Sequence, residues 1–161
     1  MVLTKPAHRH TRICFLGHVG PPSRGRPAVR YVQYLALGRL SALILAGDIG
    51  PLANYERFCD FLRSVYQKIA RVYLVLGNHK FYGISRQEGL GLADKLQQEP
   101  GLRGRLVVMS QKRVDLVGDT LLGCTLHSHI PPEAEDIVRS KANDFRRIAE
   151  WTVADHTAEH A

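Results

Sequence analysis

The sequence has little of what marks several large classes of protein. It contains only three cysteines in 161 residues, and Cys14, Cys59 and Cys124 lie far apart without a Cys-x-x-Cys pair. This usage is typical of reduced thiols in a cytosolic protein rather than of a disulfide framework or a zinc cluster. No apolar run approaches the roughly 18 residues that a membrane-spanning helix needs. No apolar core follows the basic residues of positions 1–12, as a secretory signal would require. We therefore expect a cytoplasmic protein with no membrane segment.

Repeats and low-complexity segments are also absent, and the length corresponds to one domain. Basic residues outnumber acidic ones by 22 to 15, which gives a formal net charge of +7. This excess favours an anionic partner, but it does not choose among phosphate esters, nucleic acids and acidic proteins. Because the basic residues are scattered, without the aromatic-interleaved stripe of single-strand binders, we do not expect a nucleic-acid partner.

Three short apolar runs, each ending at a glycine, are the predicted strands Ile13–Leu16, Ala42–Ala46 and Val72–Leu76. Continuous runs of this kind that alternate with helices are typical of parallel strands buried on both faces. The segment Asn54–Lys68 has an apolar stripe at helical spacing, which includes Cys59, and would connect the second strand to the third. The sequence thus predicts an α/β fold over residues 13–161, preceded by a flexible tail at 1–12.

The remaining elements are predicted from capping and turn signals. Ser85 and Glu88 have the spacing of a capping box that opens a helix ending near Gln98. Gly89 weakens this helix, and Gly118–Asp119 is typical of a hairpin turn. The other predicted elements are a helix at Ala28–Leu37, strands at Leu106–Met109, Arg113–Val117 and Thr120–Leu126, and a last helix from about Asn143 with Phe145, Ile148 and Trp151 on one face.

Each predicted parallel strand is followed by glycine and then by a residue able to bind metal. These residues are His18, Asp48 and Asn78, and His79 comes directly after Asn78. The ligand site of a parallel sheet lies beyond the carboxyl ends of its strands, so these side chains could converge on one edge. Oxygen and imidazole ligands together suit Mn, Fe, Zn or Mg ions. A single Gly-Asp pair is often only a turn, but three such pairs at equivalent strand ends are hard to explain in that way.

The segments around two of these strand ends resemble motifs of the calcineurin-like metallophosphoesterases. Ile44–Gly50 is similar to the second motif of that family (GDxx), and Leu76–His79 is similar to the third (GNHD or GNHE). The resemblance continues through Leu122–Thr125 and Asn143–Trp151, so it covers most of the chain from Ile13 onward. It implies a layered β-sandwich flanked by helices, incomplete here at the C-terminus, that hydrolyses phosphate esters with two divalent metal ions.

The resemblance also implies a role for each matching residue. Asp48 would bridge both metal ions, Asn78 would ligate the second ion, and His18 would match the histidine of the first motif. His79 would lie beside the scissile phosphate, where it would protonate the leaving oxygen or stabilise the charge that develops there. Two dications about 3.5–4 Å apart would activate a bridging hydroxide and clamp the phosphoryl oxygens.

The chain departs from the family's pattern at three places. Leu16 stands two residues before His18, where the family has aspartate, and Lys80 stands where the third motif has aspartate or glutamate. The family's later histidine and GHxH motifs are absent. A cation beside two dications is unfavourable, so Lys80 would either point to solvent or hold phosphate directly. The candidate substitutes among the other histidines are His127 and His129 after a predicted strand, and His156 and His160 on one face of a helix.

The matching ligands His18, Asp48 and Asn78 include only one negative charge for two divalent ions. We therefore expect a metallophosphoesterase domain with weak hydrolysis or none. Two alternatives stay open: a non-catalytic module that binds a phosphate-bearing or acidic partner, and a fragment of a longer phosphoesterase. Without the strands of the family's C-terminal part, a sheet edge would be exposed, and chains could associate through it.

Overall fold

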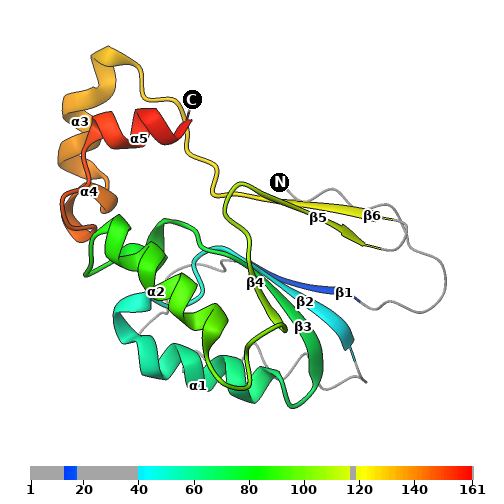
Figure 1. The fold of residues 1–161 in the computed structure, drawn as a ribbon. Coiled ribbons are helices and arrows are strands. Elements are labelled where there is room, and N and C mark those ends of the chain that lie inside the picture. The colour runs from blue at the N-terminus through cyan, green and yellow to red at the C-terminus, as the bar shows by residue number, and fades with distance from the viewer. Residues whose placement is uncertain (1–12, 18–39, 117–118, 161) are drawn as a thin grey trace.

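The computed structural model describes residues 13–17, 40–116 and 119–160 (Figure 1). Its strands are β1 (Ile13–Gly17), β2 (Leu40–Ala46), β3 (Ile69–Val75), β4 (Leu106–Val108), β5 (Lys112–Leu116) and β6 (Asp119–Gly123). Its helices are α1 (Tyr55–Val65), α2 (Arg86–Gln98), α3 (Glu135–Lys141), α4 (Asp144–Arg147) and α5 (Val153–His160), with short 3-10 helices η2 (Leu52–Asn54), η3 (Asn78–Phe81) and η4 (Pro132–Ala134). The predicted tail at 1–12, the predicted helix at 28–37 and His18 lie outside the described residues. In the part of the chain that is described, no helix has the length and apolar character needed to cross a membrane.

Four parallel strands form the main sheet, in the order β1-β2-β3-β4. The three predicted apolar runs supply β1, β2 and β3, and Ala46 pairs with Val75 at the carboxyl ends of β2 and β3. Successive side chains of β2 face opposite sides, because Leu43 and Leu45 belong to one buried cluster and Ile44 to another. The chain therefore has an α/β fold with a small parallel sheet and a small antiparallel one.

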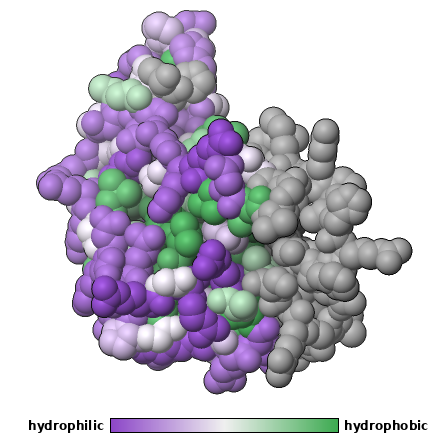
Figure 2. Space-filling model, turned by 45° about the vertical axis from the view of Figure 1, so that its right-hand side comes forward, coloured by the Kyte–Doolittle hydropathy of each residue, from purple (hydrophilic) through white to green (hydrophobic). Residues whose placement is uncertain are grey.

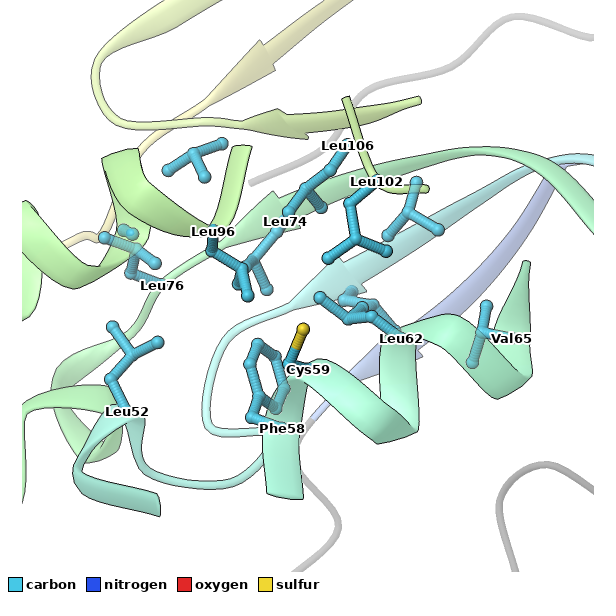
Figure 3. Packing of buried hydrophobic residues seen from close by; sticks show 14 of the residues in the cluster. Leu52, Phe58, Cys59, Leu62, Val65, Leu74, Leu76, Leu96, Leu102 and Leu106 are labelled. Atoms are coloured by element: carbon cyan, nitrogen blue, oxygen red, sulfur yellow. The ribbon is translucent and has the colours of Figure 1, made fainter. Parts of the chain in front are cut away.

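Helices α1 and α2 cover one face of the main sheet (Figures 1 and 3). The helix predicted over Asn54–Lys68 forms as α1, but it follows the 3-10 helix η2, and the side chain of Asn54 makes no capping hydrogen bond. The buried side chains of α1 recur at helical spacing and are Phe58, Cys59, Leu62 and Val65. They share one cluster with Leu74 of β3 and Leu96 of α2. Full burial of each large apolar side chain stabilises the fold by roughly 1.5–3 kcal/mol.

The hairpin of β5 and β6 packs on the opposite face of the main sheet. Its strands are antiparallel, as the predicted hairpin turn requires. Leu121 of β6 is only 3% exposed and lies in a second cluster with Ile44, Tyr73 and Met109. The next residue, Leu122, is 60% exposed, so one face of the hairpin is buried and the other faces solvent. Figure 2 shows one side of the molecule, where hydrophilic residues predominate around a group of hydrophobic ones.

Helix α2 begins where the capping box predicts, and it ends at Gln98, as expected from the sequence. The hydroxyl oxygen of Ser85 accepts a hydrogen bond from the backbone N–H of Glu88 at 3.1 Å, which satisfies a free amide of the first turn. Gly89 weakens the helix but has a packing role, because a Cβ there would lie 2.4 Å from Cδ1 of Phe81. This glycine therefore lets α2 lie against η3, the short helix that follows β3.

The prediction of one continuous helix from Asn143 is wrong. The segment forms the four-residue helix α4, then an extended stretch, then α5. The helix breaks because the backbone N–H of Ala149 donates to the carbonyl of Ile84 at 3.0 Å, which pairs the chain with the segment before α2. Thr152 and Asp155 then cap α5 reciprocally, with N–H to oxygen distances of 2.9 and 3.1 Å. Tertiary pairing thus overrides the helical periodicity here.

Candidate functional site

The carboxyl ends of β2 and β3 lie side by side. Ala46 and Val75 are paired there, and the backbone N–H of Gly47 donates to the carbonyl of Val75 at 3.1 Å. The residues that leave the sheet at this edge are Asp48 after β2, and Asn78 and His79 after β3. The structure brings these three residues together. The third predicted ligand, His18, lies outside the described residues.

Gly77 allows a close approach between the two strand ends. Its φ is +68°, in the left-handed region that favours glycine. A Cβ at this position would lie 2.6 Å from Oδ1 of Asp48 and 2.8 Å from the backbone nitrogen of Asp48. Asp48 has a φ of +44°, a conformation that aspartate adopts more readily than most residues. The glycine after β3 is therefore needed both for the turn and to make room for Asp48.

Asp48 and His79 are in direct contact. The backbone N–H of His79 donates to Oδ1 of Asp48 at 3.2 Å, and the imidazole Nδ1 lies 3.6 Å from Oδ2. The second separation is longer than that of a hydrogen bond. The side chain of His79 is 36% exposed and that of Asp48 is 18% exposed. The imidazole can therefore meet a molecule from solvent while its ring stays beside a carboxylate.

Asn78 is held by Asp144, which Tyr82 holds in turn, and sequence reasoning missed both of these residues. Its Nδ2 donates to both carboxylate oxygens of Asp144, each at 2.8 Å, and the hydroxyl of Tyr82 donates to Oδ1 of Asp144 at 2.6 Å. Burial, reinforced by the bond to Asp144, raises the pKa of Tyr82, so its hydroxyl stays protonated at neutral pH. The rings of Tyr82 and His79 lie 4.5 Å apart. The only sequence signal was the family resemblance of Asn143–Trp151, which does not single out Asp144.

Lys80 corrects a prediction from the sequence. Its side chain is fully buried: Nζ donates to the carbonyl oxygen of Ile49 and lies 3.3 Å from the centroid of the Phe58 ring. Burial lowers the pKa of Lys80 well below its ordinary value, and the charge of Asp48 acts in the opposite direction. The expectation that Lys80 points to solvent or holds phosphate is therefore wrong. The methylene groups of Lys80 pack into the core, and its amine contacts the carbonyl oxygen of Ile49 and the face of the Phe58 ring.

Two of the histidines considered as substitute ligands, His127 and His156, pack against each other and against Trp151. The ring centroid of His127 lies 4.8 Å from that of His156 and 5.9 Å from that of Trp151, and Nε2 of His156 lies 2.9 Å from the carbonyl oxygen of Ser128. Burial, with a smaller effect from His156, lowers the pKa of His127. His127 and Asn78 both line a small, partly open hollow, together with Trp151. These contacts are those of a packed aromatic cluster that holds α5.

The described residues provide few donors for a metal ion. Within residues 13–17, 40–116 and 119–160, no three His, Cys, Asp or Glu side chains form a group that could hold one. His129 is exposed, and the side chain of His160 is not described. The carboxylate of Asp48 and the carboxamide of Asn78 are hard oxygen donors. Cations of the Mg²⁺ or Mn²⁺ type bind such oxygens, often one or two from the protein, and complete their shell with water or phosphate. This pair of residues does not fit two such ions.

Comparison of the chain with known protein families, with curated proteins and with solved structures finds no match. The functional argument therefore depends on the residues and the geometry at the ends of β2 and β3.

Proposed function

We propose that this chain is a calcineurin-like metallophosphoesterase domain, a metal-dependent hydrolase of phosphate esters, and that its hydrolysis is weak. The observation that carries the proposal is the meeting of Asp48, Asn78 and His79 at one edge of a parallel sheet. The same three residues are those that the motif resemblance identifies, from two segments about thirty positions apart. Ligand sites of α/β folds lie at this edge, which supports the proposal independently of the motifs.

Asp48 and Asn78 would hold a divalent cation through their side-chain oxygens. When bound, such a cation polarises phosphoryl oxygens and lowers the pKa of a coordinated water. Neither side chain is fully buried, so both can meet a cation that arrives from solvent. The carboxylate of Asp48 accepts a hydrogen bond from His79, but each carboxylate oxygen has two lone pairs and can accept a second partner.

His79 is the proposed catalytic residue. Its side chain is 36% exposed, and it is flanked by the carboxylate of Asp48 and by the ring of Tyr82. These two contacts restrict the ring, so that it can hold a proton at the leaving oxygen of a bound phosphate ester. General acid catalysis of this kind typically contributes about 10²–10⁴-fold to the rate.

We expect weak hydrolysis because the described donor set is small. Asp48 brings one negative charge, whereas Asp144 already accepts hydrogen bonds from Asn78 and Tyr82. A single cation would be held by few protein ligands, and its affinity would be low. The second ion that the family resemblance implies has no ligands of its own among the described residues.

The finer features of the fold are also proposals. Packing of the β5-β6 hairpin on the main sheet, through Leu121 and Tyr73, supports a layered sandwich. Cys59 and Cys124 are free thiols in the structure, which is compatible with a cytoplasmic protein. Leu122 is strongly exposed on β6, an edge strand of the two-stranded sheet, and chains could associate there.

The burial of Lys80 removes one argument for the alternative of a non-catalytic module, whereas the net charge of +7 that also favours it is unaffected. An assay of p-nitrophenyl phosphate hydrolysis in the presence of Mn²⁺ distinguishes the proposed enzyme from a non-catalytic module, because only the enzyme releases p-nitrophenol. The wild-type chain should release p-nitrophenol slowly, and a chelator or Asp48→Asn should abolish the release. His79→Gln should slow it by about 100-fold or more.

Asp60→Asn is the matched control, since Asp60 is a 72% exposed aspartate on α1 and should leave the rate unchanged. Hydrolysis that persists equally in Asp48→Asn, or no hydrolysis by the wild-type chain with any of Mn²⁺, Mg²⁺ and Zn²⁺, contradicts the proposed function. Phosphate binding that survives the chelator, without hydrolysis, would favour the module.

A further inference from the structure

The contact between Asn78 and Asp144 joins parts of the chain that are distant in sequence. Asn78 begins η3, which two residues separate from the end of β3, and Asp144 begins α4, 66 positions later. Both carboxylate oxygens of Asp144 lie 2.8 Å from Nδ2 of Asn78. A partly buried amide that is held by both oxygens of one acid has little freedom to rotate.

The chemistry of this contact determines which way the Asn78 carboxamide faces. An ionised carboxylate accepts hydrogen bonds and cannot donate them, so the group that faces Asp144 must be the NH₂ and not the carbonyl. The carboxamide oxygen of Asn78 is then on the other arm of the amide, turned away from Asp144. Oxygen is the atom by which asparagine binds a hard cation, whereas the NH₂ group has no lone pair to offer.

Asp144 is itself fixed in position. The hydroxyl of Tyr82 donates to Oδ1 of Asp144 at 2.6 Å, and the backbone carbonyl of Asp144 accepts from the N–H of Ile148 at 2.9 Å. Ala149 is in turn bonded to the chain before α2. The carboxylate therefore cannot follow the amide of Asn78 if that amide turns.

We propose that Asp144 is a positioning residue, which turns the carboxamide oxygen of Asn78 away from itself and presents it to a divalent cation. This inference rests on the proposed function, because it requires a cation site at Asp48 and Asn78. A contact that only ties α4 to η3 would stabilise the fold and leave the affinity for a cation unchanged. The two roles therefore predict different results in a binding experiment.

Asp144→Asn replaces the acceptor-only acid by an amide of nearly the same shape. The new amide can donate to the carbonyl of Asn78 as well as accept from its NH₂, so the carboxamide is no longer held in one orientation. Changes to residues that orient metal ligands typically weaken binding about 10–100-fold, and we expect a loss of about this size in the affinity for Mn²⁺.

Two further variants separate orientation from packing. In Asn78→Asp/Asp144→Asn the acid and the amide exchange places, so the hydrogen bond between positions 78 and 144 is kept. Both terminal atoms of the side chain at position 78 are then oxygens that can bind a cation. This double variant should bind Mn²⁺ at least as tightly as the wild-type chain. Tyr82→Phe removes one donor to Asp144 without touching Asn78, and it should weaken Mn²⁺ binding less than Asp144→Asn does. If Asp144→Asn does not fold, the Mn²⁺ affinities of these two variants still test whether Asp144 orients the carboxamide of Asn78.

The experiment measures free Mn²⁺ by electron paramagnetic resonance during titration of each full-length variant, together with its melting temperature. Asp136→Asn on α3, where the aspartate is 94% exposed, is the matched control and should bind as the wild-type chain does. Weaker binding by Asp144→Asn with recovery in the double variant supports the inference. Equal binding by the wild-type chain and Asp144→Asn overturns it and leaves the proposed function standing. No binding of Mn²⁺ by the wild-type chain overturns the proposed function, and this inference with it.

Discussion

Replacement of Gly77 by alanine would test how closely Asp48 packs against the end of β3. The added Cβ has two separate costs. A φ of +68° with a ψ of 167° is a conformation that essentially only glycine adopts, and it costs another residue about 1–3 kcal/mol. The contacts at 2.6 and 2.8 Å with Asp48 would also force the backbone or the carboxylate to move. Overpacking of this kind adds about 1–3 kcal/mol, so Gly77→Ala should lower the free energy of unfolding by about 2–6 kcal/mol in total.

Gly101→Ala is the matched control, because Gly101 also has a positive φ, of +85°, but a Cβ there would meet no atom within 4 Å. We therefore expect Gly101→Ala to lower the free energy of unfolding by only about 1–2 kcal/mol. A larger loss in Gly77→Ala reflects the close approach of Asp48 to Gly77 together with the backbone conformation of Gly77, which essentially only glycine adopts.

Urea denaturation followed by circular dichroism gives both free energies of unfolding. Titration with Mn²⁺ should show, in addition, that Gly77→Ala weakens cation binding and Gly101→Ala does not, because only the first displaces Asp48. Equal destabilisation by the two substitutions, with equal Mn²⁺ affinity, would refute the packing of Asp48 against Gly77.

Two other predictions concern the buried lysine and the hairpin. Because burial lowers the pKa of Lys80, wild-type stability should fall as the pH drops from the ordinary value of 10.5 toward the lowered pKa, and Lys80→Met should remove this dependence. Urea denaturation of both proteins between about pH 7 and 10 measures it, and identical slopes for the two proteins would show that the lysine titrates normally. Leu121→Ala should cost about 2–5 kcal/mol because Leu121 is buried between the sheets, whereas Leu122→Ala should change stability by no more than about 0.5 kcal/mol. Similar losses for both leucines, measured by thermal unfolding, would contradict the packing of the hairpin.

The strands, the first two helices and the hairpin could be predicted because their signals are local. The apolar runs around Ile44 and Val72 are continuous, and the stripe through Leu62 repeats at helical spacing. Ser85 and Glu88 form a capping box within four positions, and their bond is present in the structure. Adjacent parallel strands also explain why Asp48 and Asn78 leave the sheet at the same edge.

The remaining features depend on contacts between distant segments, for which the sequence has no local signal. The break after α4 comes from Ala149 pairing with Ile84, and the periodicity around it is still that of a helix. Lys80 is charged and follows a motif, so its burial beside Phe58 could not be expected from its type. Asp144 is hydrogen-bonded to Asn78 across 66 positions of the chain, a contact that only the folded structure reveals.

The most direct test of the cation site is titration of the chelator-treated chain with Mn²⁺, with Asp48→Asn and the control Asp60→Asn measured beside it. A site made by Asp48 and Asn78 predicts weak binding of about one ion per chain, lost in Asp48→Asn and unchanged in Asp60→Asn. Binding that Asp48→Asn leaves unchanged, or no binding by the wild-type chain, would contradict a cation site at the ends of β2 and β3.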